Sequence, residues 1–161
     1  MPTVYILTGL PGSGKTTWVG HNFRNPDNAV WTGTDKFIDR IARQQGKTYN
    51  QVFADYMPTA ISLMIDEVLE AFSEDKNLVW DQTSLTVESR AKKLKMVPPH
   101  YKKVAVIFST PRPEIHKKML DRPGKIIPES VLENMKNSFV EPTLSEGFDE
   151  IQKPSLLGLT F

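Results

Sequence analysis

The stretch Gly9-Leu10-Pro11-Gly12-Ser13-Gly14-Lys15-Thr16 fits G-x-x-x-x-G-K-[ST], the pattern of a phosphate-binding P-loop. Such a loop needs a strand before it and a helix after it, because loop amides and the helix N-terminus converge on the phosphate oxygens. Both are predicted: an apolar, β-branched run lies at residues 4–7, and residues 15–23 have the length of a helix. We therefore expect the loop to bind a nucleoside triphosphate, with contacts from Gly9, Pro11, Gly12, Ser13, Gly14, Lys15, Thr16 and Thr17.

Short apolar runs and helical segments alternate along the rest of the chain. Strands are predicted at residues 29–31, 78–80 and 104–108. Helices are predicted at residues 58–73, with Pro58 in the first turn, after Thr86, from Pro113 and from Pro128. This alternation is typical of an α/β fold with a mainly parallel sheet flanked by helices, whose ligand site lies at the carboxyl ends of the strands. The tail after Pro142 is compatible with packing on the sheet or with extending it.

Two aspartates follow predicted strands and should therefore lie at the ligand edge of the sheet. Asp81 is placed to complete a Mg²⁺ site together with Thr16, as a Walker-B acid does, unless it only caps the next turn. Asp35 is the candidate general base, because phosphoryl transfer to a hydroxyl needs a carboxylate within hydrogen-bond reach of that hydroxyl. The alternative for Asp35 is a solvated turn residue.

A basic loop that contains Pro and Gly separates two of the predicted helices and carries Arg122. A mobile lid over about residues 112–128 could bring this arginine onto a transferring phosphoryl group that Lys15 already contacts. Arg122 would then be catalytic together with Lys15 and Asp35. An ordinary surface arginine is the alternative.

Composition narrows the class of protein. The 161 residues are 39% hydrophobic and 24% charged with a net charge of +1, which is typical of one soluble globular domain. The absence of cysteine excludes disulfide scaffolds, Cys-based zinc sites and thiol nucleophiles. No apolar run is long enough to span a membrane and no signal-peptide pattern is present, so we expect a cytoplasmic protein, or one in the host cytoplasm if it is phage-encoded.

Charge is unevenly distributed, with eleven basic residues against two acidic ones between Arg90 and Lys125. A nucleic-acid strand needs cationic side chains along its path, although a solvated helix face would have the same composition. Bases also stack on aromatic side chains, which are otherwise core residues. Four aromatic residues follow the candidate base: Phe37, Tyr49, Phe53 and Tyr56.

Three segments together resemble one enzyme family. Residues 9–18 are close to G-x-P-G-[SA]-G-K-[ST]-T-[WF], residues 81–84 are similar to D-N-T-N with Arg90 following in the next helix, and residues 139–148 are similar to F-x-x-P-T-x-x-E-G-F. These are patterns of the polynucleotide 5′-hydroxyl kinases, which include phage kinases and the kinase half of animal polynucleotide kinase-phosphatases. The last segment discriminates best, because a generic P-loop protein gives no reason to expect it.

The resemblance implies that residues 1–161 form a single P-loop kinase domain, which includes a helical lid. It also implies ATP- and Mg²⁺-dependent transfer of the γ-phosphoryl group to the 5′-hydroxyl of a DNA or RNA end. Lys15 and Thr16 would hold the triphosphate and metal, Asp35 would be the general base and Arg122 the lid arginine, since residues 122–128 are similar to the arginine-glycine-lysine-proline pattern of some phage members. A D-x-D-x-[TV] signature does not occur, so no phosphatase domain is expected.

The chain departs from the family on the acceptor side. Gly33-Thr34 stand where family members usually carry Asn-Arg, and Ile38 stands where phage members tend to have an arginine. Lys36 or Arg40 could take the place of that arginine, although Arg40 could equally be a helix-surface residue. Arg90, in the basic segment, is a further candidate for a nucleic-acid contact. Two alternatives therefore stay open: a P-loop kinase for a small hydroxyl acceptor such as a nucleoside, sugar or antibiotic, and a nucleotide-binding switch.

Overall fold

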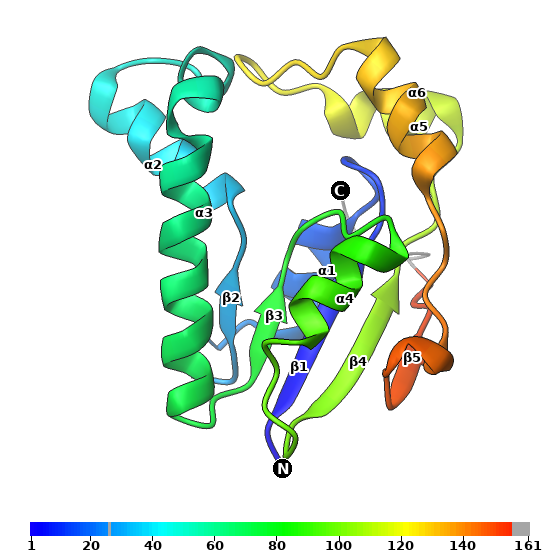
Figure 1. Cartoon of the computed structure of the whole chain (residues 1–161). Helices are drawn as coiled ribbons and strands as arrows, with labels where there is room; N and C mark the ends of the chain where they lie inside the picture. The colour runs from blue at the N-terminus through cyan, green and yellow to red at the C-terminus, as the bar shows by residue number, and fades with distance from the viewer. Residues whose placement is uncertain (26, 156–161) are drawn as a thin grey trace.

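The computed structural model describes residues 1–25 and 27–155 and contains a five-stranded parallel sheet (Figure 1). The strand order is β2-β3-β1-β4-β5. The strands are β1 (Thr3–Thr8), β2 (Val30–Thr32), β3 (Leu78–Trp80), β4 (Lys102–Ile107) and β5 (Glu150–Gln152). The predicted parallel α/β fold is thereby confirmed, and the tail after Pro142 extends the sheet, because β5 pairs with β4.

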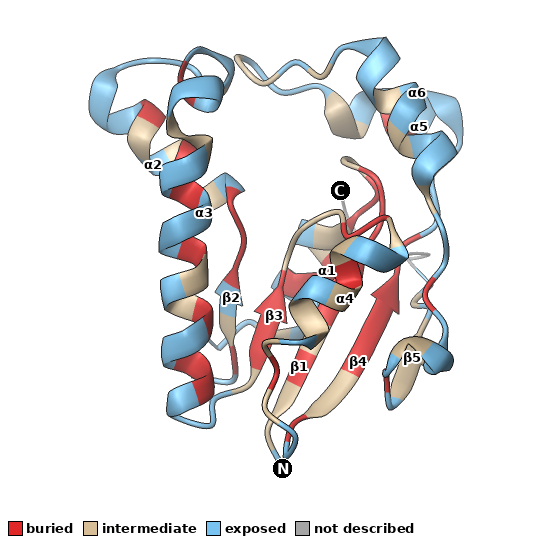
Figure 2. Cartoon of the chain, viewed as in Figure 1, coloured by how far each residue is buried: buried red, intermediate tan, exposed pale blue. Residues whose placement is uncertain are grey.

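Helices cover both faces of this sheet, which is why its central strands are apolar on both sides. On one face, α1 (Lys15–Asn22) packs Trp18 and Val19 into a cluster with Val104, Val106 and Phe108. On the other face, α3 (Tyr49–Ser73) contributes Met64, Val68 and Phe72 to a cluster that includes Ile6 and Trp80. α4 (Val87–Leu94) lies on the same face as α3, and Figure 2 shows the buried strands between these layers.

The α2–α3 region differs from the prediction. Helix α2 (Asp35–Gln45) was not expected, and α3 begins at Tyr49, nine residues before the predicted start at Pro58. A capping box starts α3: Gln51 N donates to the Thr48 hydroxyl, and Thr48 N donates to the Gln51 side chain. A proline inside a helix costs about 3 kcal/mol, and the burial of Val52 and Ala60 on either side of Pro58 offsets this cost.

Two further helices, α5 (Pro113–Leu120) and α6 (Glu129–Ser138), stand above the carboxyl ends of the strands (Figure 1). The starts predicted at Pro113 and Pro128 agree with them. We call residues 113–138 the α5–α6 segment. Most of it is exposed (Figure 2), and its connecting loop extends across to the corner between α2 and α3. A search of the described residues found no helix long and apolar enough to cross a membrane.

Candidate active site

The P-loop follows β1 and leads into α1, as predicted. Two of its glycines have positive φ, Gly12 at 72° and Gly14 at 97°. Lys15 Nζ donates to the carbonyls of Gly9 at 2.9 Å and Leu10 at 2.8 Å, so the ammonium group folds back over the loop. Burial lowers the pKa of Lys15 to about 8, and the nearby carboxylates of Asp81 and Asp35 only partly oppose this shift.

The loop suits a triphosphate. No side chain in the described part of the chain caps the N-terminus of α1, so its first amides remain available to an anion. The hydroxyl of Ser13 is buried and has no hydrogen-bond partner among the described residues. Thr16 is exposed in the first turn of α1. Its hydroxyl and the Asp81 carboxylate are hard oxygen donors of the kind that Mg²⁺ accepts.

Asp81 lies directly after β3, beside the P-loop strand. Its backbone N–H donates to Thr32 O at 2.7 Å, and Trp31 Nε1 donates to its carboxylate Oδ2 at 3.0 Å. Burial raises the pKa of Asp81, against the opposing effects of Lys15 and of the Trp31 hydrogen bond. Gly33 permits this approach of the chain segments, because a Cβ at that position would lie 2.2 Å from the Asp81 carbonyl oxygen.

Asp35 is the first residue of α2 and is held by two donors. Tyr49 Oη donates to Asp35 Oδ1 at 2.6 Å, and Lys125 Nζ donates to Oδ2 at 2.7 Å. Burial favours the neutral acid, but the Lys125 charge, these two hydrogen bonds and the more distant Lys15 outweigh it and lower the pKa of Asp35. The carboxylate is therefore ionised and able to accept a proton, as the base assignment requires.

The loop of the α5–α6 segment docks on the α2–α3 corner. Lys125 pairs with Asp35, and Arg122 pairs with Asp39. Asn50 adds three hydrogen bonds: its backbone N–H donates to Gly124 O, its amide donates to Ile126 O, and its carbonyl accepts from Ile126 N. The expected lid arginine thus lies on the side of α2, and Lys125, which sequence reasoning missed, is the cation that touches the candidate base.

The other end of this segment is anchored on the P-loop. His116, which is buried in α5, donates from Nε2 to Pro11 O at 2.7 Å. A Cβ at Gly12 would lie 2.9 Å from the Leu120 side chain, so α5 is in close contact with the loop. The α5–α6 segment consequently touches both the P-loop and the surroundings of Asp35.

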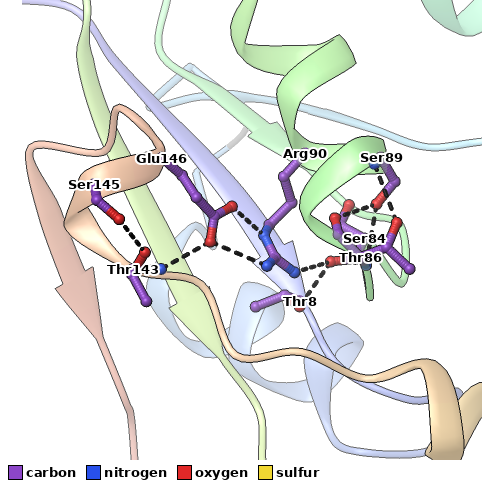
Figure 3. A network of polar contacts seen from close by, with 8 residues as sticks. All are labelled: Thr8, Ser84, Thr86, Ser89, Arg90, Thr143, Ser145 and Glu146. Carbon is purple, nitrogen blue, oxygen red and sulfur yellow. Dashed lines mark hydrogen bonds and ion pairs between the residues drawn. The ribbon is translucent and has the colours of Figure 1, made fainter.

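Arg90 supports the site instead of contacting nucleic acid. Its side chain is fully buried, and Nε and Nη2 donate to Glu146 at 2.8 and 3.1 Å (Figure 3). Nη1 donates at 2.9 Å to Ser84 O, which also accepts from the Thr8 hydroxyl at 2.9 Å. Arg90 has no exposed surface to offer a nucleic acid, so that expectation is wrong. The network fixes the loop after β3, which carries Asp81, against the P-loop strand.

A groove runs along the length of α4. One part, of about 470 Å³, lies between the loop after β3 and α6, and an adjoining part of about 310 Å³ lies between α3 and α4. Lys93 lines both parts, with its ammonium 5.5 Å from the centre of the Trp80 ring. Burial, and secondarily the charge of Arg90, lowers the pKa of Lys93 to about 8. The other predicted contact, Arg40, is exposed on α2 with its guanidinium 5.2 Å from the Phe37 ring centre.

Comparisons with known proteins agree with this fold. A chain in the structure of the Pnkp1/Rnl/Hen1 RNA repair complex is similar, with a TM-score of 0.65 and 23% identity over 85% of this chain and 43% of that one. A gluconokinase from Sinorhizobium meliloti is similar with a TM-score of 0.54 and 17% identity over 94% of this chain and 81% of that one. At these identities the likeness shows a shared P-loop kinase fold alone.

A sequence relative is much longer than this chain. The human protein named heterogeneous nuclear ribonucleoprotein U-like protein 2 is 27% identical over 157 residues, which is 92% of this chain and 21% of that protein. The chain therefore spans about a fifth of this curated relative. Residues 4–142 match the family described as "AAA domain", which is most of the chain, from β1 through the P-loop, both candidate acids and the α5–α6 segment. The chain belongs to this AAA domain family.

Proposed function

We propose that the protein is an ATP- and Mg²⁺-dependent kinase that transfers the γ-phosphoryl group to the 5′-hydroxyl of a DNA or RNA end. The observation that carries this proposal is the ionised Asp35 carboxylate, which is held close enough to Lys15 for the two charges to affect each other's pKa. A P-loop that only binds and releases nucleotide has no need of such a base. Bound Mg²⁺, held by Thr16 and Asp81, would neutralise negative charge on the phosphate oxygens.

The chemical step balances with the residues present. The acceptor hydroxyl gives its proton to Asp35 as its oxygen forms a bond to the γ-phosphorus, and the bond from that phosphorus to the bridging oxygen breaks to release ADP. Lys15, turning from the loop carbonyls to the phosphates, stabilises the developing charge. Arg122 would join it only after leaving Asp39.

Three observations support a polynucleotide acceptor. The groove beside α4 contains the cation of Lys93 and leads along the loop that carries Asp81. The Arg90–Glu146 pair joins two of the segments that resemble the polynucleotide kinases. The names of two relatives also refer to RNA, through an RNA repair complex and a ribonucleoprotein.

A small hydroxyl acceptor is the second candidate. Ile38 is fully buried in the core, so the position at which phage kinases tend to have an arginine offers no charge to an acceptor phosphate. The similar fold of a gluconokinase shows that this architecture also serves a sugar kinase. The two candidates share the phosphoryl donor and the base, and differ in the acceptor.

Transfer from γ-labelled ATP with Mg²⁺ separates them. The acceptors are 5′-hydroxyl DNA and RNA oligonucleotides, the same oligonucleotides with 5′-phosphates, a nucleoside panel and gluconate. Label on 5′-hydroxyl oligonucleotides, lost in Asp35→Asn and retained in Asp66→Asn, supports the proposal. Asp66 is a matched control because it is exposed near the far end of α3. Label only on small acceptors, or only free phosphate, would contradict the proposal.

A further inference from the structure

Tyr49 occupies a fixed position between the candidate base and the α5–α6 segment. It is the first residue of α3, so the Thr48–Gln51 capping box sets where its backbone lies. Gly124 packs against Thr48 so closely that a Cβ there would lie 2.7 Å from the Thr48 Cβ. The start of the helix and the docked loop therefore hold this tyrosine from two sides.

The contacts of the Tyr49 side chain divide into two kinds. Its hydroxyl donates to Asp35 Oδ1 at 2.6 Å, a length typical of a strong hydrogen bond to an ionised carboxylate. Its ring faces the cations of the docked loop, with Lys125 Nζ 4.4 Å and the Arg122 guanidinium 5.8 Å from the ring centre. Burial and the Asp35 carboxylate raise the pKa of Tyr49, so the phenol keeps its proton and remains a donor.

The two oxygens of Asp35 consequently have different environments. Oδ1 accepts from a side chain that the helix start holds in place, whereas Oδ2 accepts from Lys125, a long flexible side chain on a loop. A free carboxylate can rotate and present either oxygen, which lowers the fraction of time in a reactive geometry. Fixing Oδ1 leaves Oδ2 as the oxygen that an incoming hydroxyl can approach once Lys125 moves.

We infer that Tyr49 is the positioning residue of the phosphoryl-transfer site: it orients Asp35 through Oδ1 so that Oδ2 receives the proton of the acceptor hydroxyl in the place that Lys125 now occupies. This inference rests on the proposed kinase function. It assigns a role to a residue that lies outside the P-loop, at the start of α3. It also requires Lys125 to move away from Oδ2 before transfer. Lys125 keeps its proton when it moves, and the acceptor hydroxyl then takes its place beside Oδ2.

The test compares Tyr49→Phe with Tyr56→Phe. The first variant keeps the ring that faces the loop cations and removes only the hydroxyl bonded to Asp35. The second removes a hydroxyl from the same helix whose partner is Gln45 Nε2 at 2.6 Å, away from the base. We expect kcat to fall about 10- to 100-fold in Tyr49→Phe with KM for ATP within about twofold of the wild type, and Tyr56→Phe to retain wild-type kcat.

A pH readout separates positioning from a general loss of structure. Asp35 faces Tyr49 from α3, Lys125 from the docked loop, Lys15 from α1 and Asp81 from the end of β3. Of these groups only Tyr49 loses a donor in the variant, so the Asp35 pKa and the acid limb of kcat/KM should both move to higher pH. Titration of the Asp35 carboxyl carbon by NMR measures the pKa without any acceptor. Equal melting temperatures of the two variants establish that both fold.

The outcomes are distinct. The first outcome is that the wild type labels its acceptor, and that Tyr49→Phe has the same kcat and the same acid limb of kcat/KM as Tyr56→Phe. This outcome overturns the inference, and the kinase function stands. If the wild type labels no acceptor, the proposed function fails, and the titration decides alone. An unchanged Asp35 pKa in Tyr49→Phe then overturns the Tyr49–Asp35 contact, and a raised pKa upholds it.

Discussion

Replacing Glu146 by Gln should destabilise the protein far more than its position at the end of a single-turn 3₁₀ helix (Leu144–Glu146) implies. Arg90 is fully buried and relies on this carboxylate, which accepts from Nε at 2.8 Å and from Nη2 at 3.1 Å. Removing one partner of a buried ion pair typically costs about 3–5 kcal/mol, because the remaining charge is left uncompensated. Gln keeps one acceptor oxygen, so we expect the lower end, about 3 kcal/mol of unfolding free energy.

The same number sets the expected change in melting temperature. For a chain of this size, each 1 kcal/mol corresponds to about 2–4 °C, so Tm should fall by about 6–12 °C. Urea unfolding followed by circular dichroism gives the free energy, and a thermal scan gives Tm. The control is Glu141→Gln, which removes another carboxylate from the segment between α6 and β5. Its ion pair with Lys153 leaves both side chains more than half exposed, so the cost should stay below about 1 kcal/mol.

A loss in Glu146→Gln no larger than that in Glu141→Gln would refute the reasoning. It would mean that the Arg90 guanidinium is adequately satisfied by Ser84 O and its surroundings. A double variant sharpens the test, since Arg90→Met removes the stranded charge. Glu146→Gln should therefore cost much less in the Arg90→Met background than in the wild type.

Three further predictions address pH, the P-loop and the groove. Burial alone would raise the pKa of Glu146, but the Arg90 hydrogen bonds, the Thr143 amide and the Arg90 charge outweigh burial and lower this pKa. The contribution of Glu146 to the free energy of unfolding is therefore complete above the ordinary glutamate pKa of 4.5 and is lost as pH falls below that value. The stability difference between wild type and Glu146→Gln should therefore be full at neutral pH and narrow as pH falls below about 4.5. Gly12→Ala should raise the calorimetric Kd for ATP by about tenfold, because Gly12 has a φ of 72° and a Cβ there would lie 2.9 Å from the Leu120 side chain. Gly20→Ala is the comparison in α1. A Cβ at Gly20 meets nothing within 4 Å, so this variant should raise the unfolding free energy by about 0.5–1 kcal/mol. In steady-state assays, Lys93→Ala should raise KM for an oligonucleotide several-fold and leave KM for ATP unchanged. The salt dependence of the oligonucleotide KM should fall by the release of about one counterion. If the variant and the wild type have the same salt dependence, the oligonucleotide does not bind along the groove.

Features encoded locally could be predicted from the sequence. The P-loop needs only its glycines and the strand and helix around it, and β3 lies beside β1 as the alternation of elements required. Asp35 and Asp81 follow strands of one parallel sheet, so their meeting at its carboxyl edge follows from the topology. Thr86 starts α4 with the predicted cap, because capping involves residues only three positions apart.

Features that depend on distant partners could not be predicted. Arg90 reads as part of a basic segment because its partner, Glu146, lies 56 positions away, and only the folded chain brings them together. The Tyr49 and Lys125 contacts with Asp35 likewise depend on how the α5–α6 segment docks on the α2–α3 corner. The start of α3 was predicted too late for a different reason. Proline is typical of the first turn of a helix, so Pro58 indicated a helix start, whereas α3 continues through Pro58 because its buried face stabilises it.

The hydrogen bond from Trp31 to Asp81 gives the molecule an optical signal of its own. Of the three tryptophans, Trp18 and Trp80 are buried and Trp31 is 39% exposed, so the red-edge emission comes chiefly from the indole that touches the candidate metal ligand. Any cation that engages the Asp81 carboxylate changes the electrostatic field at this indole. Intrinsic fluorescence can therefore follow occupancy of the site in the unmodified protein, with Trp31→Phe as the silent control.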